Sequence, residues 1–155
     1  MISINIKNIG NITVIDNNVV VYKMIRKSPI PFSKTVGELF HFDKKVATIH
    51  HGFIRKKIVF QDFAFHVKIL KQQIFSSIFS IDDNLIQVNH NPFFLFNKNF
   101  CKVYYNSELV IEITIKSTVD LSGYNLDLKF FIENELVKQA SLICFIIYSI
   151  EYNLS

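Results

Sequence analysis

The chain has 155 residues, of which 50% are hydrophobic and 19% charged, and its formal net charge is +4. This length suits one domain with a full core, so we expect a single domain over residues 1–155. The sixteen Phe and six Tyr residues exclude a disordered chain. The charge is uneven, because residues 1–71 carry twelve Lys or Arg against four Asp or Glu, whereas residues 72–155 carry five against nine.

The first residues show the alternation of a β-strand. Ile2, Ile4 and Ile6 are separated by polar residues, which is typical of a strand and not of a secretory signal. The expected location is therefore the cytoplasm, where thiols stay reduced. Cys101 and Cys144 are accordingly expected to be free core residues and not a disulfide.

Period-two alternation continues through most of the chain, and clusters rich in Asp and Asn interrupt it at regular intervals. Asp and Asn bond to their own backbone and tolerate left-handed geometry, so each cluster predicts a hairpin turn. The five predicted turns are Asp16–Asn18, Asp43–Lys45, Gln61–Asp62, Asp82–Asn84 and Asn106–Ser107. Their spacing predicts a meander of about ten to twelve antiparallel strands over roughly residues 2–131.

Three other segments interrupt or end this meander. Ser28–Pro31 and Asn91–Pro92 are predicted loops. Phe93–Phe96 is an aromatic run without clean alternation, for which we expect a strand that is buried on both faces. The alternative is an exposed lip that meets a partner or a membrane. Ser122–Gly123 then precedes a last predicted strand, Tyr124–Phe130.

The end of the chain carries its most distinctive segment, which reads ENELVKQASLICFIIYSIEY over residues 133–152. Acidic residues at Glu133 and Glu135 suit the positive end of a helix dipole, so we expect a helix over roughly residues 133–151. Ala140–Tyr148 is apolar apart from Ser141, which leaves no face for water. It is too short to cross a bilayer, which needs ~20 apolar residues. Core positions are therefore expected on every side of the helix, at Ala140, Ile143, Phe145, Ile147 and Ile150.

A long meander leaves two open edges unless it closes on itself, and an all-round apolar helix can fill the closed form. The predicted fold is therefore mainly β: a closed antiparallel β-barrel of about 10–12 meander strands around a buried hydrophobic C-terminal helix. A pleckstrin-homology-like sandwich is the rival fold, but its terminal helix is amphipathic and its strands are fewer. A barrel filled by its own helix also disfavours a carrier of internal ligands.

One unit of the sequence recurs, in which an aromatic residue precedes an Asp and then Val and Ile positions. It runs from Phe40 to Ile49 and from Phe79 to Val88, with a looser copy from Cys101 to Ile111, and the apolar helix closes the chain. This layout resembles the tubby C-terminal-like superfamily, which includes the plant LURP-one-related proteins and phospholipid scramblases. The resemblance covers nearly the whole chain, and the terminal helix is its most specific feature. It implies a barrel around a hydrophobic helix and a non-enzymatic, membrane-associated or regulatory role.

Two clusters of basic residues are the candidate binding site for an anionic surface: Arg26 and Lys27, and Arg55, Lys56 and Lys57. The alternative is that these are solvated outer positions of strands, and in a strand Lys56 faces away from its two neighbours. We therefore predict a non-enzymatic binding module, for instance for phospholipid head groups, on a cytoplasmic protein that attaches peripherally to a membrane. The alternative function is a protein-interaction scaffold with no small ligand.

Other chemistry finds little support in the sequence. No Ser lies in a nucleophile elbow, no Gly-rich phosphate loop is present, and the His residues lack the spacing of metal ligands, so we predict no enzyme activity, cofactor or metal. Asp82–Asp83 is an acidic pair that a turn already explains. The Phe residues occupy core-like positions, which disfavours stacking on nucleic acid. The sequence specifies no oligomeric state.

Overall fold

The structure, a computed structural model, describes residues 1–7, 11–27, 35–51, 56–61, 63–73, 75–118 and 123–152. Within these residues the chain forms twelve strands and two helices. The strands are β1 (Ile2–Lys7), β2 (Asn11–Asp16), β3 (Val19–Lys27), β4 (Thr35–His41), β5 (Lys44–His51), β6 (Lys56–Phe60), β7 (Val67–Gln72), β8 (Ser76–Ile81), β9 (Asn84–His90), β10 (Asn99–Tyr105), β11 (Glu108–Thr118) and β12 (Gly123–Phe130). The helices are α1 (Phe94–Asn97) and α2 (Glu135–Tyr152).

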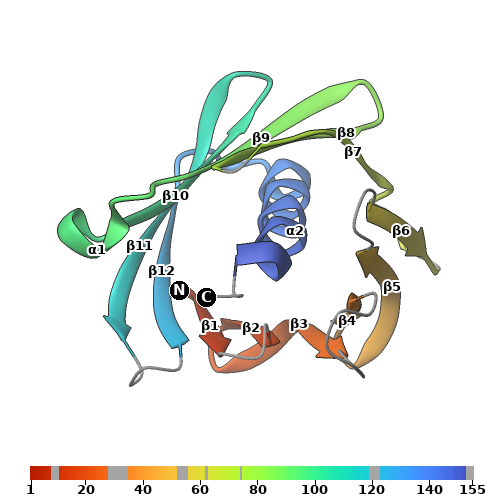
Figure 1. Ribbon diagram of the computed structural model, residues 1–155, viewed down its shortest axis with the longest axis horizontal. Helices are drawn as coiled ribbons and strands as arrows, with labels where there is room; N and C mark the ends of the chain where they lie inside the picture. The colour runs from red at the N-terminus through yellow and green to blue at the C-terminus, as the bar shows by residue number, and fades with distance from the viewer. Residues whose placement is uncertain are drawn as a thin grey trace.

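All twelve strands belong to one antiparallel sheet, which curls into a nearly closed barrel (Figure 1). The sheet order is β6-β5-β4-β3-β2-β1-β12-β11-β10-β9-β8-β7. The first and last strands are therefore paired, from Ser3 opposite Asp127 to Lys7 opposite Gly123. The barrel confirms the predicted fold class and strand number. The barrel differs from the predicted closed form in one respect. β6 and β7 are the two edges of the sheet, and they meet at a seam where no hydrogen-bonded ladder joins them.

Four of the five predicted hairpins are present, and their turns have the expected left-handed backbone. Asn17 and Asn18 have φ of 48° and 66°, and Asn106 and Ser107 have φ of 47° and 70°. Two consecutive positive φ values match the twist of the flanking strands. The turn predicted at Asp43–Lys45 is centred one residue earlier, at Phe42 and Asp43, so that Lys44 begins β5.

The fifth predicted hairpin, around Gln61–Asp62, is wrong. Phe63–His66 forms no strand, and the chain passes through this segment from β6 to β7, which pairs with β8 instead. Aromatic packing explains the difference, because the Phe60 ring stacks on Phe63 at 6.3 Å and on His66 at 5.2 Å between ring centroids. Asp62 and the predicted loop Ser28–Pro31 lie outside the described residues.

The strand expected at Phe93–Phe96 is also wrong, because this run forms the single helical turn α1 at the end of β9. Asn91 starts the turn, since its Oδ1 accepts a hydrogen bond from the Phe93 N–H at 3.0 Å. Lys98 ends it with φ of 61°, and the Lys98 N–H donates to the Phe94 carbonyl at 2.8 Å. The exposed-lip alternative therefore describes this segment better than the buried strand does.

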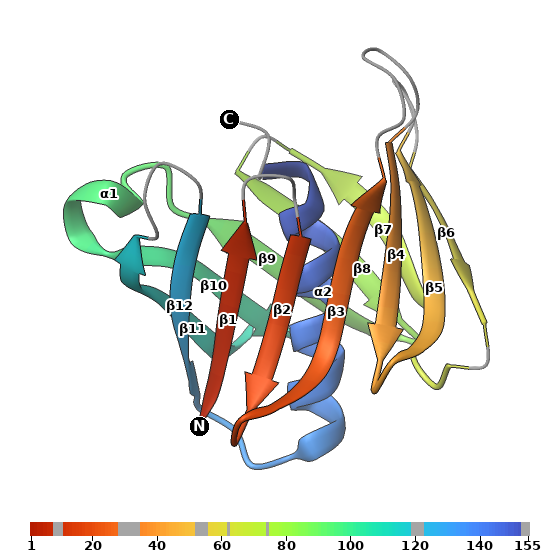
Figure 2. The ribbon, with the colours of Figure 1, turned by 90° about the horizontal axis from the view of Figure 1, so that it is seen from below.

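The C-terminal helix α2 runs along the inside of the barrel, as predicted (Figure 1, Figure 2). Asn134 caps its start, because Asn134 Oδ1 accepts hydrogen bonds from the N–H groups of Leu136 at 3.0 Å and Val137 at 3.3 Å. Residues 141–149 are all buried, so the helix has no water-facing side there. The predicted core positions at Ala140, Ile143, Phe145 and Ile147 are confirmed, and the side chain of Ile150 lies outside the described residues.

The core fills the space between α2 and the inner wall of the barrel. Each strand supplies alternate residues, such as Ile4, Val14, Met24 and Leu39, which are at most 1% exposed. The helix packs most closely on β8, β9, β10 and β11. A hydrogen bond of 2.7 Å from the Tyr22 hydroxyl to Gln139 Oε1 also joins it to β3. The interior is therefore occupied by the chain's own side chains.

Candidate functional site

The two predicted basic clusters lie at the ends of two strands, β3 and β6, that are not neighbours in the sheet. Arg26 and Lys27 are the last two residues of β3, and Lys56 and Lys57 are the first two of β6. Arg55 and the side chain of Lys56 lie outside the described residues. Since β3 and β6 are separated by β4 and β5 in the sheet, only the strand register decides which of these side chains share a face.

The register brings Lys27 and Lys57 onto one face. Lys27 is opposite Val36, Val36 is opposite His50, and His50 is opposite Lys57. Directly paired residues of antiparallel strands point to the same side of the sheet. Lys27, His50 and Lys57 are exposed, so this row lies on the outer face of the barrel.

Arg26 does not join that row. It continues the inward alternation of the buried residues Tyr22 and Met24, and its side chain is half-buried on the inner side of β3. Burial lowers the pKa of its guanidinium. Among the described side chains of the predicted site, Lys27 and Lys57 therefore share one face of the wall and Arg26 does not, because neighbours in a strand alternate between the two faces.

The outer face of β3, β4 and β5 holds two further cations, Lys23 and Lys45. Lys23 is exposed on β3 at the same alternation as Lys27, a signal that the sequence VVVYKMIRK already contains. Lys45 lies on β5, and its Nζ is 3.6 Å from Glu38 Oε1. Lys27 Nζ is 3.1 Å from the same oxygen, and its hydrogen bond holds the pKa of Glu38 below the ordinary value. Glu38 thus offsets part of the positive charge on this face.

A broader concentration of charge appears at one end of the barrel. Because adjacent strands are antiparallel, odd-numbered strands end where even-numbered strands begin, and α2 ends there too (Figure 2). Among the described residues within two positions of these strand ends there are cations and no Asp or Glu, and Glu151 is next to the last residue of α2 at the same end. Lys98 follows α1 at the same end. We call this end the basic rim; its described cationic residues are Lys7, Arg26, Lys27, Lys56, Lys57, Lys71, Lys98 and Lys116.

The opposite end carries the hairpin turns and the start of α2, and we call it the turn rim. It bears charges of both signs among its described residues. The acidic residues are Asp16, Asp43, Asp82, Asp83, Glu108, Glu133 and Glu135, and the lysines are Lys44, Lys45, Lys68, Lys129 and Lys138. The charge therefore differs between the two ends of the barrel: cations predominate among the described residues of the basic rim, and the turn rim carries both signs.

A pocket of about 260 Å³ lies on the outer face where β1, β2, β11 and β12 meet. Ser3, Asn17, Lys116 and Asp127 are among its lining residues. The Asp127 Oδ1 atom is buried and accepts no hydrogen bond, so this pocket suits a hydrogen-bond donor or a cation better than an anion. It is not a natural place for an anionic head group.

The side chains with the largest pKa shifts lie in the core and not in this pocket. Burial raises the pKa of Tyr22 to about 12 and raises those of the Cys101 and Cys144 thiols, which are both free and buried. Across the described residues, no group of three or more His, Cys, Asp or Glu side chains is placed to hold a metal ion. None of the described helices combines the length and apolarity needed to span a bilayer.

A comparison with protein-family models found no match to this chain, and comparisons with curated proteins and with solved structures found none either. The resemblance to the tubby C-terminal-like superfamily therefore stays a prediction.

Proposed function

We propose that this protein is a non-enzymatic binding module whose basic rim attaches to an anionic surface, with the phospholipid head groups of a membrane as the ligand. The tubby-like layout is in keeping with such a role. Attachment is peripheral and reversible, because it depends on surface charge.

The observation that carries this proposal is the predominance of cations among the described residues of the basic rim. A negatively charged leaflet attracts each nearby Lys or Arg by ~1 kcal/mol, and the attraction decays within a Debye length of about 10 Å at 0.1 M salt. Lys7, Lys27, Lys57, Lys71 and Lys98 are exposed at one end of the barrel. Cations at a common end can approach one flat surface together, whereas cations spread around the wall cannot.

Two further features favour an outer surface over an internal site. Residues 141–149 of α2 are buried along the barrel interior, so the space that a carrier protein uses for its ligand is filled. The outer pocket is lined by the Asp127 carboxylate as well as by Lys116, so its charges do not favour an anion. An anionic partner is therefore expected at the rim.

Vesicle co-sedimentation tests the proposal. Purified protein is mixed with vesicles of phosphatidylcholine alone, or of phosphatidylcholine with phosphatidylserine, at low and at high salt. We expect retention on the anionic vesicles at low salt, strong loss at high salt, and little retention on neutral vesicles. Equal retention on both vesicle types removes the preference for an anionic surface, and no retention on either removes the lipid proposal and leaves the protein-interaction scaffold as the better account.

A further inference from the structure

An apolar tip stands at the basic rim. The side chains of Phe93, Leu95 and Phe96 are 65%, 67% and 89% exposed, and they belong to the single turn α1 and the residue before it. We call these three residues the apolar tip. The turn projects from the barrel wall between β9 and β10 (Figure 1, Figure 2). A group of three large apolar side chains exposed to water indicates an interaction site more strongly than a single exposed apolar side chain does.

The tip is held in place by an aromatic anchor. Phe94, the residue between the exposed ones, is half-buried against the wall. Its ring centroid lies 5.3 Å from that of His90, 5.2 Å from that of Phe100 and 5.6 Å from that of Tyr124. Because consecutive residues of a helical turn point in different directions, fixing Phe94 inward fixes its neighbours outward.

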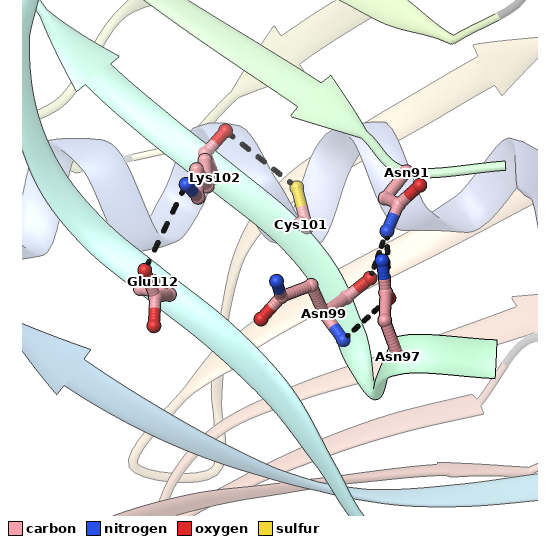
Figure 3. A network of polar contacts seen from close by, with 6 residues as sticks. All are labelled: Asn91, Asn97, Asn99, Cys101, Lys102 and Glu112. Atoms are coloured by element: carbon pink, nitrogen blue, oxygen red, sulfur yellow. Dashed lines mark hydrogen bonds and ion pairs between the residues drawn. The ribbon is translucent and has the colours of Figure 1, made fainter. Parts of the chain in front are cut away.

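A hydrogen-bond network fastens the base of the same turn (Figure 3). Asn91 Nδ2 donates to Asn97 Oδ1 and to the Asn99 carbonyl, both at 2.9 Å, and the Asn99 N–H donates to Asn97 Oδ1 at 3.1 Å. A four-residue helix is not stable alone, so these contacts maintain its shape. The exposure of the tip is thus a built feature of this loop.

The surroundings of the tip indicate which surface it meets. From Asn91 to Asn99 the sole charged side chain is the exposed Lys98, and the rest of the segment is amide or apolar. The tip also shares its end of the barrel with the cations of the basic rim. Apolar side chains flanked by cations match the profile of an anionic bilayer, whose head groups are negative and whose interior is apolar.

We infer that the apolar tip inserts into the acyl-chain boundary of an anionic membrane while Lys98 stays among the head groups. The inference rests on the proposed function, because the basic rim supplies the first attraction. It adds a contact that salt does not screen, so attachment has an electrostatic part and an apolar part. The tip also fixes orientation, since it places the basic rim against the leaflet and the turn rim toward water.

The chain has no Trp, so one introduced Trp reports its surroundings without background. Phe96→Trp places the probe in the tip, and Phe42→Trp places it at an exposed site of the turn rim. With phosphatidylcholine/phosphatidylserine vesicles we expect Phe96→Trp emission to shift to shorter wavelength and to be quenched by brominated acyl chains. Phe42→Trp emission should stay unchanged.

A matched pair of double variants measures the contribution of the tip to attachment. Phe93→Ser/Phe96→Ser should reduce retention on anionic vesicles by at least about tenfold, because burial of a large apolar side chain is comparable in strength to the attraction of one or more cations. Phe42→Ser/Leu136→Ser removes exposed apolar side chains from the turn rim and should bind like the wild type. Circular dichroism checks that both variants are folded.

The outcomes separate this inference from the proposed function. Retention on anionic vesicles with unshifted Phe96→Trp emission overturns tip insertion and leaves the proposed function standing. Equal retention on neutral and anionic vesicles, with shifted Phe96→Trp emission, supports insertion and overturns the anionic preference. No retention on any vesicle overturns both.

Discussion

His90 links the anchor of the apolar tip to the core. Its ring lies 5.3 Å from Phe94, 4.9 Å from Phe100 and 6.4 Å from Tyr148, measured between ring centroids. These rings displace water, and burial lowers the pKa of the His90 imidazole below its ordinary value of 6.5. A protonated His90 is therefore disfavoured in the folded state.

The lowered pKa predicts a pH dependence of folding. Between the folded and unfolded pKa values of His90, the unfolded chain binds more protons, so stability rises with pH. The free energy of unfolding should have its full value above about pH 6.5 and should decrease as the pH drops below it. His41, whose pKa burial also lowers, adds to the same window. Urea unfolding between about pH 5 and 8 measures the effect.

His90→Gln should flatten this dependence, and His50→Gln is the control because His50 is exposed on the outer face of β5. Glu38 affects stability in a more acidic pH range. Hydrogen bonding by Lys27 lowers the pKa of Glu38 from 4.5, so the stability that ionised Glu38 contributes is lost only at more acidic pH. If His90→Gln keeps the full loss of stability below pH 6.5, His90 is not its source.

Among the elements, α2 determines whether the barrel has a core. Ile147 is fully buried, and an ionised carboxylate there has no partner, which costs several kcal/mol against a total stability of about 5–15 kcal/mol. Ile147→Asp should therefore leave the protein unfolded or insoluble. Thermal melting followed by circular dichroism checks this result.

Leu136→Asp is the matched control, since Leu136 is 70% exposed in the first turn of the same helix. An acidic residue near a helix N-terminus interacts favourably with the helix dipole, so this variant should melt close to the wild type. Ile147→Ala removes apolar volume without adding charge and should cost about 2–5 kcal/mol. A soluble Ile147→Asp variant with a cooperative melt contradicts a helix buried on all sides.

The seam makes β6 and β7 the least protected strands. Each is hydrogen-bonded along one side only, whereas β1 and β12 have neighbours on both sides. Exposed lysines at Lys57, Lys68 and Lys71 and a register shift between Ile69 and Lys71 discourage pairing with another chain at these edges.

Amide hydrogen exchange should follow this difference between the strands. We expect fast exchange in β6 and β7 and slow exchange in β1, β11 and β12, because an edge strand opens with fewer broken contacts. Mass spectrometry of peptic fragments gives the comparison. Equal protection of β6 and β12 is incompatible with an open seam and indicates a fully closed barrel.

Much of this element layout could be predicted because local chemistry determines it. The turns at Asn17–Asn18 and Asn106–Ser107 need left-handed backbone, which Asn accepts, and the run of apolar residues in α2 can be read directly from the sequence. The strands predicted at Phe63 and Phe94 are wrong for one physical reason. Aromatic side chains at strand-like positions pack equally well in loops, and only partners distant in sequence, such as Tyr124 for Phe94, decide between the two.

At the scale of the whole molecule, the distribution of charge differs between the two ends of the barrel. The sequence already shows an excess of cations before residue 72, but it cannot show that Lys57 and Lys27 share a row or that Arg26 turns inward. Those facts depend on strand register, which links residues across four strands. Lys98 comes from the acidic half of the sequence and still lies at the basic rim, because the chain returns there after β9.

The central claim is that the basic rim is the end that meets an anionic surface. Removing cations from one end at a time tests this claim. The Lys7→Gln/Lys57→Gln/Lys71→Gln variant removes three exposed cations from the basic rim, and Lys44→Gln/Lys68→Gln/Lys129→Gln removes three from the turn rim with the same change in net charge. At ~1 kcal/mol per cation, the first variant should bind phosphatidylserine-containing vesicles roughly a hundredfold more weakly, and the second should bind like the wild type. Equal weakening of both variants would mean that net charge alone drives binding, and loss in the turn-rim variant alone would place the contact at the opposite end of the barrel.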